Sequence, residues 1–163
     1  MGAKIQLIGK PEKLRVEGTI VTFHITTGPS VKHAPKGLQL FGETTYVVQC
    51  TRRQLNRGRA SENDDSELII EGYQEPRVDK RSGRPRIAVV AMSLTSMRKQ
   101  NERKLAQISD QFVKAEEEYA AAYERYGGDS PEARAALEGM EKVKGNLLKF
   151  LERHPELKRK SLF

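Results

Sequence analysis

The feature that most constrains this chain is a change of hydrophobic period near residue 97. Before it, Val21, Phe23 and Ile25 alternate with polar residues, the period of two expected of a strand with one buried face. After it, apolar residues recur every three or four positions, as they do on one face of a helix. The sequence therefore predicts a β part, residues 1–97, and a helical part, residues 98–163.

The β part contains five candidate strands separated by turn-rich stretches. The stretches at 28–37, 56–66 and 79–85 are rich in Gly, Pro, Ser and charged residues. Five short antiparallel strands favour a small closed barrel or a sandwich. The predicted strands cover residues 4–8, 21–26, 44–50, 67–71 and 86–94.

The helical part predicts two antiparallel helices joined by a short connection. Gly127-Gly128 ends the first helix, Ser130 is a good N-cap before Pro131, and Pro155 stops the second helix near Arg153. Both helices carry a regular apolar stripe. The stripes are Leu105, Ile108, Phe112, Ala115, Tyr119, Ala122 and Tyr126, then Ala133, Ala136, Met140, Val143, Leu147 and Phe150.

Length and composition exclude several classes of protein. A chain of 163 residues with 37% hydrophobic residues is too short for a large barrel enzyme. Cys50 is the single cysteine, which excludes an intrachain disulfide. The first residues do not resemble a signal peptide, and the longest apolar run, residues 87–92, is far shorter than a membrane span. We expect a soluble cytoplasmic protein with no membrane partner.

The net charge of +7 favours an anionic partner. The β part holds 15 Lys/Arg and 10 Asp/Glu, and the helical part holds 14 and 12, so the β part is the better candidate. Its cations gather in two clusters, one after the third predicted strand and one around the last turn. The clusters are Arg52, Arg53, Arg57 and Arg59, then Arg77, Lys80, Arg81, Arg84 and Arg86.

Catalytic and metal-binding patterns are absent from the sequence. Gly37 and Gly42 have the spacing of a phosphate-binding loop, but Glu43 stands where its lysine belongs. His24, His33 and His154 lie far apart without acidic or cysteine partners, so we expect no metal site. We expect no catalytic residues, no cofactor and no enzyme activity, with Cys50 as a packed thiol and His24 on the polar face of its strand.

Arginines beside aromatic side chains on a small β-barrel are typical of proteins that bind single-stranded nucleic acid. Cations follow the phosphates while rings stack on exposed bases. Tyr46 and Tyr73 lie in candidate strands, and core packing or base stacking explains each equally well. Phe41 lies in the connection before the third strand, whereas the apolar neighbours of Phe23 predict a core position.

Three segments resemble the bacterial and organellar single-stranded DNA-binding protein family, which is built on an OB-fold. Residues 5–10, Ile-Gln-Leu-Ile-Gly-Lys, resemble the family's first strand, and residues 43–48, Glu-Thr-Thr-Tyr-Val-Val, its acid-Thr-x-aromatic segment. Residues 68–72, Leu-Ile-Ile-Glu-Gly, precede a basic hairpin and a closing strand, as in the family. The resemblance covers roughly residues 4–96 and implies an OB-fold barrel that works as an oligomer.

The chain also departs from the family pattern. Val78 and Arg52 stand near positions where the family has stacking rings, which leaves Tyr46 as the clearest retained ring. The helix expected between the third and fourth strands is short or absent, because residues 51–66 offer little apolar face beyond Leu55 and Ala60. The chain ends in a basic segment, Leu157 to Phe163, where the family often ends in an acidic tip that recruits partner proteins.

The sequence therefore predicts an all-β OB-fold barrel of five strands followed by an antiparallel helical hairpin, α+β overall. The expected function is single-stranded DNA binding without sequence preference in replication, recombination or repair, in a nucleoid-associated homo-oligomer. The alternative is an OB-fold adaptor of the replication or recombination machinery that contacts proteins through its helical hairpin; RNA binding also stays open. The expected nucleic-acid-binding residues are Lys10, Arg15, Tyr46, Arg52, Arg53, Arg57, Arg59, Tyr73, Arg77, Lys80, Arg81, Arg84 and Arg86.

Overall fold

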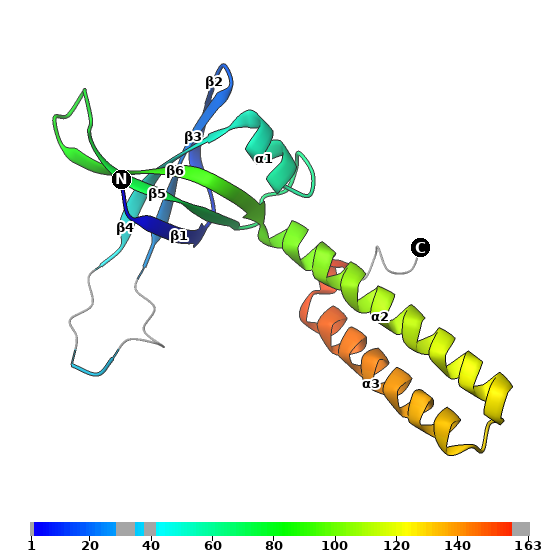
Figure 1. Ribbon diagram of the computed structural model, residues 1–163. Helices are drawn as coiled ribbons and strands as arrows, with labels where there is room; N and C mark the ends of the chain where they lie inside the picture. The colour runs from blue at the N-terminus through cyan, green and yellow to red at the C-terminus, as the bar shows by residue number, and fades with distance from the viewer. Residues whose placement is uncertain (1, 29–34, 38–41, 158–163) are drawn as a thin grey trace. The chain divides into compact units, whose positions relative to one another are not determined.

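The computed structural model describes residues 2–28, 35–37 and 42–157 (Figure 1). The chain divides into two compact units, residues 1–99 and residues 100–163. Phe41, His33 and the basic residues 158–163 lie outside the described residues.

The first unit contains one six-stranded sheet. Its strand order is β1-β5-β6-β4-β3-β2, and all neighbours are antiparallel except β4 and β6, which are parallel. The strands are β1 (Lys4–Gly9), β2 (Glu12–Glu17), β3 (Ile20–Thr27), β4 (Thr44–Thr51), β5 (Leu68–Val78) and β6 (Pro85–Ser96).

The prediction of five strands was wrong, because the described part of the chain contains a sixth, β2. All six residues of β2 are exposed, so it has no buried face to produce a strong apolar pattern. Pro11 separates β2 from β1 and has no N–H to continue the pairing of β1 with β5. The chain changes its neighbour at this point, and β2 pairs with β3 instead.

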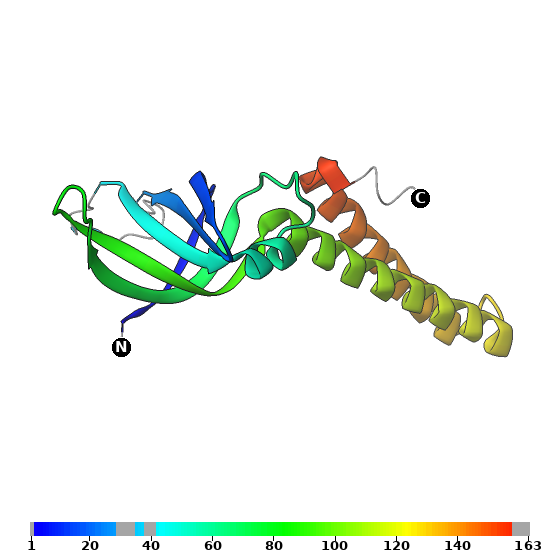
Figure 2. The ribbon, with the colours of Figure 1, turned by 90° about the horizontal axis from the view of Figure 1, so that it is seen from above.

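The sheet is strongly curved, because β1 and β2 follow each other in sequence yet occupy its two opposite edges (Figures 1 and 2). Gly9 permits the curvature at the end of β1. A Cβ atom there would lie 2.7 Å from Cγ2 of Ile25 on β3, closer than any side chain allows. The end of β1 therefore lies directly against β3.

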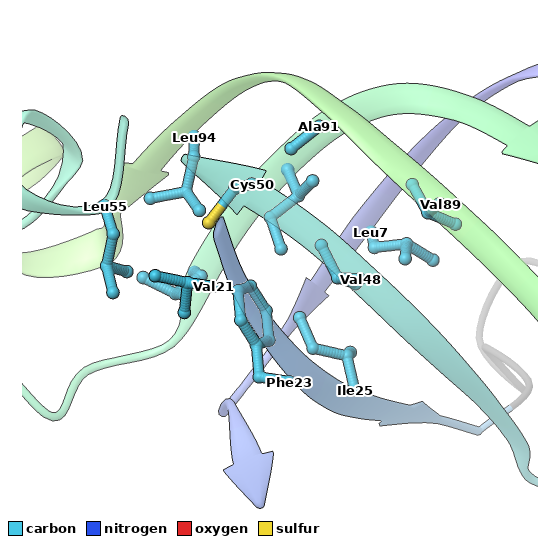
Figure 3. Close-up of a cluster of buried hydrophobic side chains, with 12 residues drawn as sticks. Leu7, Val21, Phe23, Ile25, Val48, Cys50, Leu55, Val89, Ala91 and Leu94 are labelled. Atoms are coloured by element: carbon cyan, nitrogen blue, oxygen red, sulfur yellow. The ribbon is translucent and has the colours of Figure 1, made fainter. Parts of the chain in front are cut away.

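A single apolar cluster fills the inside of the curved sheet (Figure 3). Phe23, predicted as a core residue, has 0% of its surface exposed. Burial of each large apolar side chain contributes roughly 1.5–3 kcal/mol to folding. The cluster comprises Leu7, Val21, Phe23, Ile25, Val48, Cys50, Leu55, Leu68, Ile70, Val89, Ala91 and Leu94.

The prediction of a short helix or none between the third and fourth predicted strands agrees with α1 (Arg52–Gly58). The Thr51 side chain accepts a hydrogen bond from the Gln54 N–H, and the Gln54 side chain accepts one from the Thr51 N–H, which closes a capping box. Leu55 and Gly58 are the buried residues of the helix. The helix is short because only this one turn presents an apolar residue to the core.

The second unit consists mainly of two helices, which lie side by side in both views (Figures 1 and 2). They are α2 (Met97–Tyr126), which begins in the first unit, and α3 (Pro131–Arg153), followed by the 3-10 turn η2 (Pro155–Leu157). Asn101 on α2 lies 3.3 Å from the His154 ring after α3, so the helices run in opposite directions. Ser130 caps α3 by accepting a hydrogen bond from the Ala133 N–H, as its sequence predicts. No helix in the described ranges is long and apolar enough to cross a membrane.

Asp64 joins the connection after α1 to the start of α2. Its carboxylate is buried and accepts hydrogen bonds from the Ala60 N–H at 2.9 Å, from the Ser66 N–H and hydroxyl at 3.1 and 2.6 Å, and from the Ser96 hydroxyl at 2.5 Å. The two serine oxygens accept in turn from two N–H groups in the first turn of α2, those of Arg98 and Lys99. Burial opposes the charge of Asp64, but the hydrogen bonds from Ser66, Ser96 and Ala60 outweigh it and lower its pKa to about 2.

This network predicts a stability loss in acid. Because the pKa of Asp64 is lower in the folded chain than in the unfolded chain, its contribution is complete above pH ~4 and is lost as the pH falls toward 2. The contribution is on the order of 2 kcal/mol. Asp64→Asn should lower the free energy of unfolding at pH 7 by about 1–3 kcal/mol, measured by urea denaturation, and should remove most of the loss between pH 4 and 2. Asp65→Asn, a change at the exposed neighbour, should do neither; equal effects of the two variants would contradict this role of Asp64.

Candidate nucleic-acid interface

The central strands of the sheet have one core face and one outer face. On β4, Val48 and Cys50 are buried in the core, whereas Val47 and Gln49, which alternate with them, point to the outer face. Their partners on β3 follow the same division, because Val47 pairs with His24 and Gln49 pairs with Thr22. The outer face of these strands is therefore polar and accessible.

A groove with a volume of about 650 Å³ lies on this outer face, and we call it the basic groove. Five cationic and two acidic side chains line it, a net charge of +3 with His24 neutral. A second hollow, which includes Thr45 and Ile87, shares four lining residues with it and extends it along the strands. The lining residues of the basic groove are Lys13, Arg15, Glu17, Thr22, His24, Val47, Gln49, Asp79, Lys80, Arg81 and Arg86.

The turn between β5 and β6 supplies one wall of the basic groove, and Asp79 holds it in shape. The Asp79 carboxylate accepts hydrogen bonds from the Arg81 N–H and the Ser82 hydroxyl, both at 3.0 Å. It also forms an ion pair of 3.1 Å with Arg86. Hydrogen bonds from Arg81 and Ser82, with the nearby Arg86 charge, lower the pKa of Asp79. The turn closes through Gly83, whose φ of 66° suits glycine, so the cations of this wall stand on a fixed backbone.

The opposite wall comes from β2. Arg15 pairs with Thr22 on β3, and a break in the register between Glu12 and Arg15 places Lys13 at an irregular point of the strand. Lys13 has a φ of 52°, which is uncommon for a residue other than glycine. Lys13 and Arg15 thus line the groove across from Lys80 and Arg81.

One continuous row of residues crosses the outer face of the sheet. Tyr73 on β5 pairs with Val90 on β6, Val90 with Gln49, Gln49 with Thr22, and Thr22 with Arg15. Directly paired residues point to the same face, so Tyr73 shares the face of the basic groove. Its side chain is 39% exposed, which leaves the ring accessible.

Tyr46 lies differently from what the sequence predicted for a stacking ring. It occupies the same face of β4 as Val48 and Cys50 and packs against the core cluster. The structure therefore does not bring Tyr46 to the basic groove. Tyr73 is the tyrosine on the groove's face of the sheet.

His24 stands on the floor of the basic groove between the two cationic walls. Burial lowers its pKa, and the charges of Lys13, Arg86 and Arg15 lower it further, against a small opposing effect of Glu12. His24 is therefore neutral at pH 7 in the unbound chain. A bound phosphate would favour the protonated ring by adding negative charge beside it.

The other predicted cations lie outside the lining of the basic groove. Arg77 donates a hydrogen bond of 2.8 Å to Gln49 and lies 3.1 Å from Glu75, at the edge of the groove. Lys10 and Arg59 line a separate hollow with Glu62, Asp64 and Asp65, whose negative charge disfavours a phosphate there. Arg52, Arg53 and Arg57 lie on α1, and Arg84 lies in the turn after β5. The structure thus brings four predicted cations together: Arg15, Lys80, Arg81 and Arg86.

Sequence reasoning missed Lys13, His24 and Gln49 as groove residues. Two signals were present: Leu14 and Val16 alternate with charged residues before Gly18, the pattern of a short strand, and His24 occupies the polar face of its strand. No comparable signal marks Gln49, whose position depends on the pairing of β4 with β6. Within the described residues, no group of three or more His, Cys, Asp and Glu side chains is arranged to hold a metal ion.

No family model matches the chain. No curated protein matches it either. Among solved structures, the chain is similar to a small single-stranded DNA-binding protein from Mycoplasma pneumoniae, with 14% identity, a TM-score of 0.42, and coverage of 60% of this chain and 95% of that one. A small single-stranded DNA-binding protein from Streptomyces coelicolor gives 15% identity, a TM-score of 0.41, and coverage of 58% and 94%. A mitochondrial single-stranded DNA-binding protein from S. cerevisiae gives 12% identity, a TM-score of 0.40, and coverage of 60% of this chain and 96% of that one.

These TM-scores are below 0.5, so the likeness assigns no function to this chain. All three of these solved structures are single-stranded DNA-binding proteins.

Proposed function

We propose that the chain binds single-stranded DNA in its basic groove, without recognising a defined sequence. The observation that carries the proposal is the pair of cationic walls, Lys13 and Arg15 on β2 and Lys80, Arg81 and Arg86 around the β5–β6 turn. Between them lies a floor of neutral residues such as Thr22 and Gln49. Cations at the rims suit phosphates, and the floor suits bases, which only an unpaired strand exposes.

The strand connections support an OB-type barrel. β1 and β2 are joined by two residues at opposite edges of one curved sheet. If they count as one interrupted first strand, the six strands become the five of an OB-fold, with α1 between the third and fourth. OB-folds bind oligonucleotides on an open face of the barrel, and the basic groove occupies such a face. Work in replication, recombination or repair, close to the nucleoid, would follow from this activity.

A titration with labelled oligonucleotides tests the proposal. Single-stranded DNA should bind more tightly than duplex DNA or RNA, and its affinity should fall steeply with salt, because each neutralised phosphate releases counterions. The double variant Arg15→Ala/Arg81→Ala should bind single-stranded DNA more weakly. The slope of log affinity against log salt concentration should decrease in magnitude by roughly 0.7 for each phosphate that the variant no longer neutralises. Tyr73→Ala should weaken binding by roughly 1–3 kcal/mol and leave the slope unchanged, because a stacking ring releases no counterions.

Two controls define the site in this titration. Arg53→Ala removes a single positive charge from α1, outside the basic groove, and should change affinity less than Arg15→Ala does. Tyr46→Phe leaves the core ring in place and should change little. Equal binding of single-stranded and duplex DNA, or a larger effect of Arg53→Ala than of Arg15→Ala, would refute binding in the groove.

The position of His24 predicts a pH dependence. Its pKa lies below the ordinary value in the free chain, and bound phosphates raise it, so binding takes up a proton. Affinity for single-stranded DNA should therefore rise as the pH falls from 7 to about 5, below the ordinary histidine pKa of about 6.5. His24→Gln should flatten this dependence while binding at pH 7.5 stays within about threefold of the parent chain. If His24→Gln kept the full pH dependence of the affinity for single-stranded DNA, a group other than His24 would be responsible for it.

The helical unit supports a second part of the proposal, self-association. The stripes of α2 and α3 face each other only in part: Phe112, Tyr119 and Leu147 stay half-buried, although Phe150 is buried. Val113 is 50% exposed and Leu148 52% exposed. We infer that these helices pack as a hairpin against those of another copy, in a dimer or tetramer. The alternative, that the chain is an adaptor, places a replication or recombination protein on the same apolar surface.

Light scattering on the full-length chain distinguishes self-association from the adaptor alternative. The parent chain should have the mass of a dimer or larger assembly, and Val113→Glu should reduce it by placing a charge in the apolar contact. Gln111→Glu adds the same charge at an exposed polar position of α2 and should leave the mass unchanged. A monomeric parent chain would contradict self-association and favour the adaptor.

A further inference from the structure

The helical hairpin can be divided into two halves along its length. Asn101 lies beside His154 at one end of the hairpin, and residues 127–130 connect α2 to α3 at the other end. Halfway between these ends lie residue 114 on α2 and residue 141 on α3. We call residues 114–141 the distal half, and residues 97–113 together with 142–157 the proximal half.

The two halves carry opposite net charges. The distal half holds eight acidic and three basic residues, a net charge of −5. The proximal half holds eight basic and four acidic residues, a net charge of +4 with histidine counted as neutral. Because α2 and α3 run in opposite directions, the acidic segments of the two helices lie side by side, and so do the basic segments. The fold of a single hairpin therefore leaves this separation of charge in place.

An apolar groove lies on the proximal half, and we call it the hairpin groove. It has a volume of about 400 Å³, and its lining includes Leu105, Ser109, Val113 and Leu147. On the distal half, Tyr123 is 54% exposed. Tyr123 follows Ser109 by two heptads, so both residues lie on the same side of α2. The side of α2 that lines the hairpin groove thus continues onto the distal half and exposes an aromatic ring there.

We propose that a second copy of this chain occupies the hairpin groove, with the two hairpins packed antiparallel so that the distal half of each lies along the proximal half of the other. This inference rests on the self-association in the proposed function and specifies its contact face and orientation. In this arrangement, a half with a charge of −5 meets a half with a charge of +4 twice. A parallel pair would place the two acidic halves together and the two basic halves together.

The length of the hairpin makes this difference in charge decisive for the orientation. With a rise of 1.5 Å per residue, the centres of the two halves lie about 20 Å apart. Charges in solution are largely screened beyond about 8 Å at physiological ionic strength. Each half therefore interacts with the half beside it and hardly with the other one. A second copy turned by 180° presents the opposite charges in the required order.

The antiparallel arrangement also brings the apolar side chains together. When the midpoints of two α2 helices coincide, positions equally far before and after residue 114 lie at the same level. Leu105 and Tyr123 are such positions, nine residues before and after it, so the partner's Tyr123 reaches the hairpin groove. Val113, which is 50% exposed, lies next to the midpoint and faces the partner's Val113. Charge and apolar contact therefore favour the same orientation.

Disulfide cross-linking of the full-length chain tests this orientation. Ala106 and Ala120 are exposed, and each is one heptad from Val113. In the antiparallel pair, Ala106 lies about 3 Å along the axis from the level of the partner's Ala120, whereas equivalent alanines lie about 18–24 Å apart. A disulfide needs Cα atoms within about 7 Å. A mixture of Ala106→Cys and Ala120→Cys, allowed to exchange subunits before mild oxidation, should therefore give a cross-linked dimer, and neither variant alone should.

Two controls accompany the cross-linking. The parent chain, whose Cys50 is buried, gives the background. Val113→Cys should cross-link to itself, because it lies at the midpoint. Cross-linking of Ala106→Cys and of Ala120→Cys each to itself, with none between them, would show parallel packing. A multimeric chain in which none of the three variants cross-links would use another face. Either result overturns this inference and leaves self-association standing, whereas a monomeric parent chain in light scattering contradicts both.

A charge variant tests the electrostatic part of the inference. Glu117→Lys with Glu118→Lys changes the net charge of the distal half from −5 to −1. Because each contact occurs twice in the pair, the dissociation constant for self-association should rise by about tenfold, measured by light scattering over a range of concentrations. Glu62→Lys with Glu67→Lys makes the same change of charge at exposed positions of the first unit and should leave the constant unchanged. Equal effects of the two double variants would show that only the total charge matters and would overturn the inference.

Discussion

The close approach of Gly9 to Ile25 is the contact on which the rest of the first unit depends. It lets β1 end against β3, so that β1 and β2 take opposite edges of a sheet that must curve. The curvature creates an inside for the apolar cluster. It also brings Lys13 and Arg15 on one edge strand into the same groove as the β5–β6 turn. In a flat sheet, β3 and β4 would hold β2 apart from β6, and these cations would form two unrelated patches.

The alternation of β4 assigns neighbouring residues to the core and to the basic groove. Val48 and Cys50 contribute to the core, and burial raises the pKa of the Cys50 thiol to about 11, so it stays protonated and packs as an apolar group. Val47 and Gln49, on the other face, line the groove. Substitutions at the outer positions therefore change the ligand surface with little effect on the packing of the core.

Periodicity in the sequence located most of the fold, because each of the five predicted strands overlaps an observed one. It failed at β2, whose residues are all exposed, and at the length of β5, whose second half extends beyond the core. The cations of the β5–β6 turn were identifiable from their spacing. The face of Tyr46 was also accessible to sequence reasoning, since it shares its parity with Val48 and Cys50. The positions of Lys13 and Gln49 in the groove could not be predicted from the sequence, because they arise from strand pairings between distant segments.

The balance of charges in the groove has a further consequence for how tightly it can hold a strand. Asp79 stabilises the turn that carries Lys80 and Arg81, yet it also occupies Arg86 through their ion pair. A phosphate that binds Arg86 has to compete with this carboxylate, which reduces the gain from the contact. With a net charge of +3 and no Phe or Tyr among the described lining residues, most of the attraction is electrostatic. If the groove binds single-stranded DNA as we propose, its complexes would form and dissociate readily as ionic conditions change, whereas tight retention would require more stacking rings than Tyr73 alone provides.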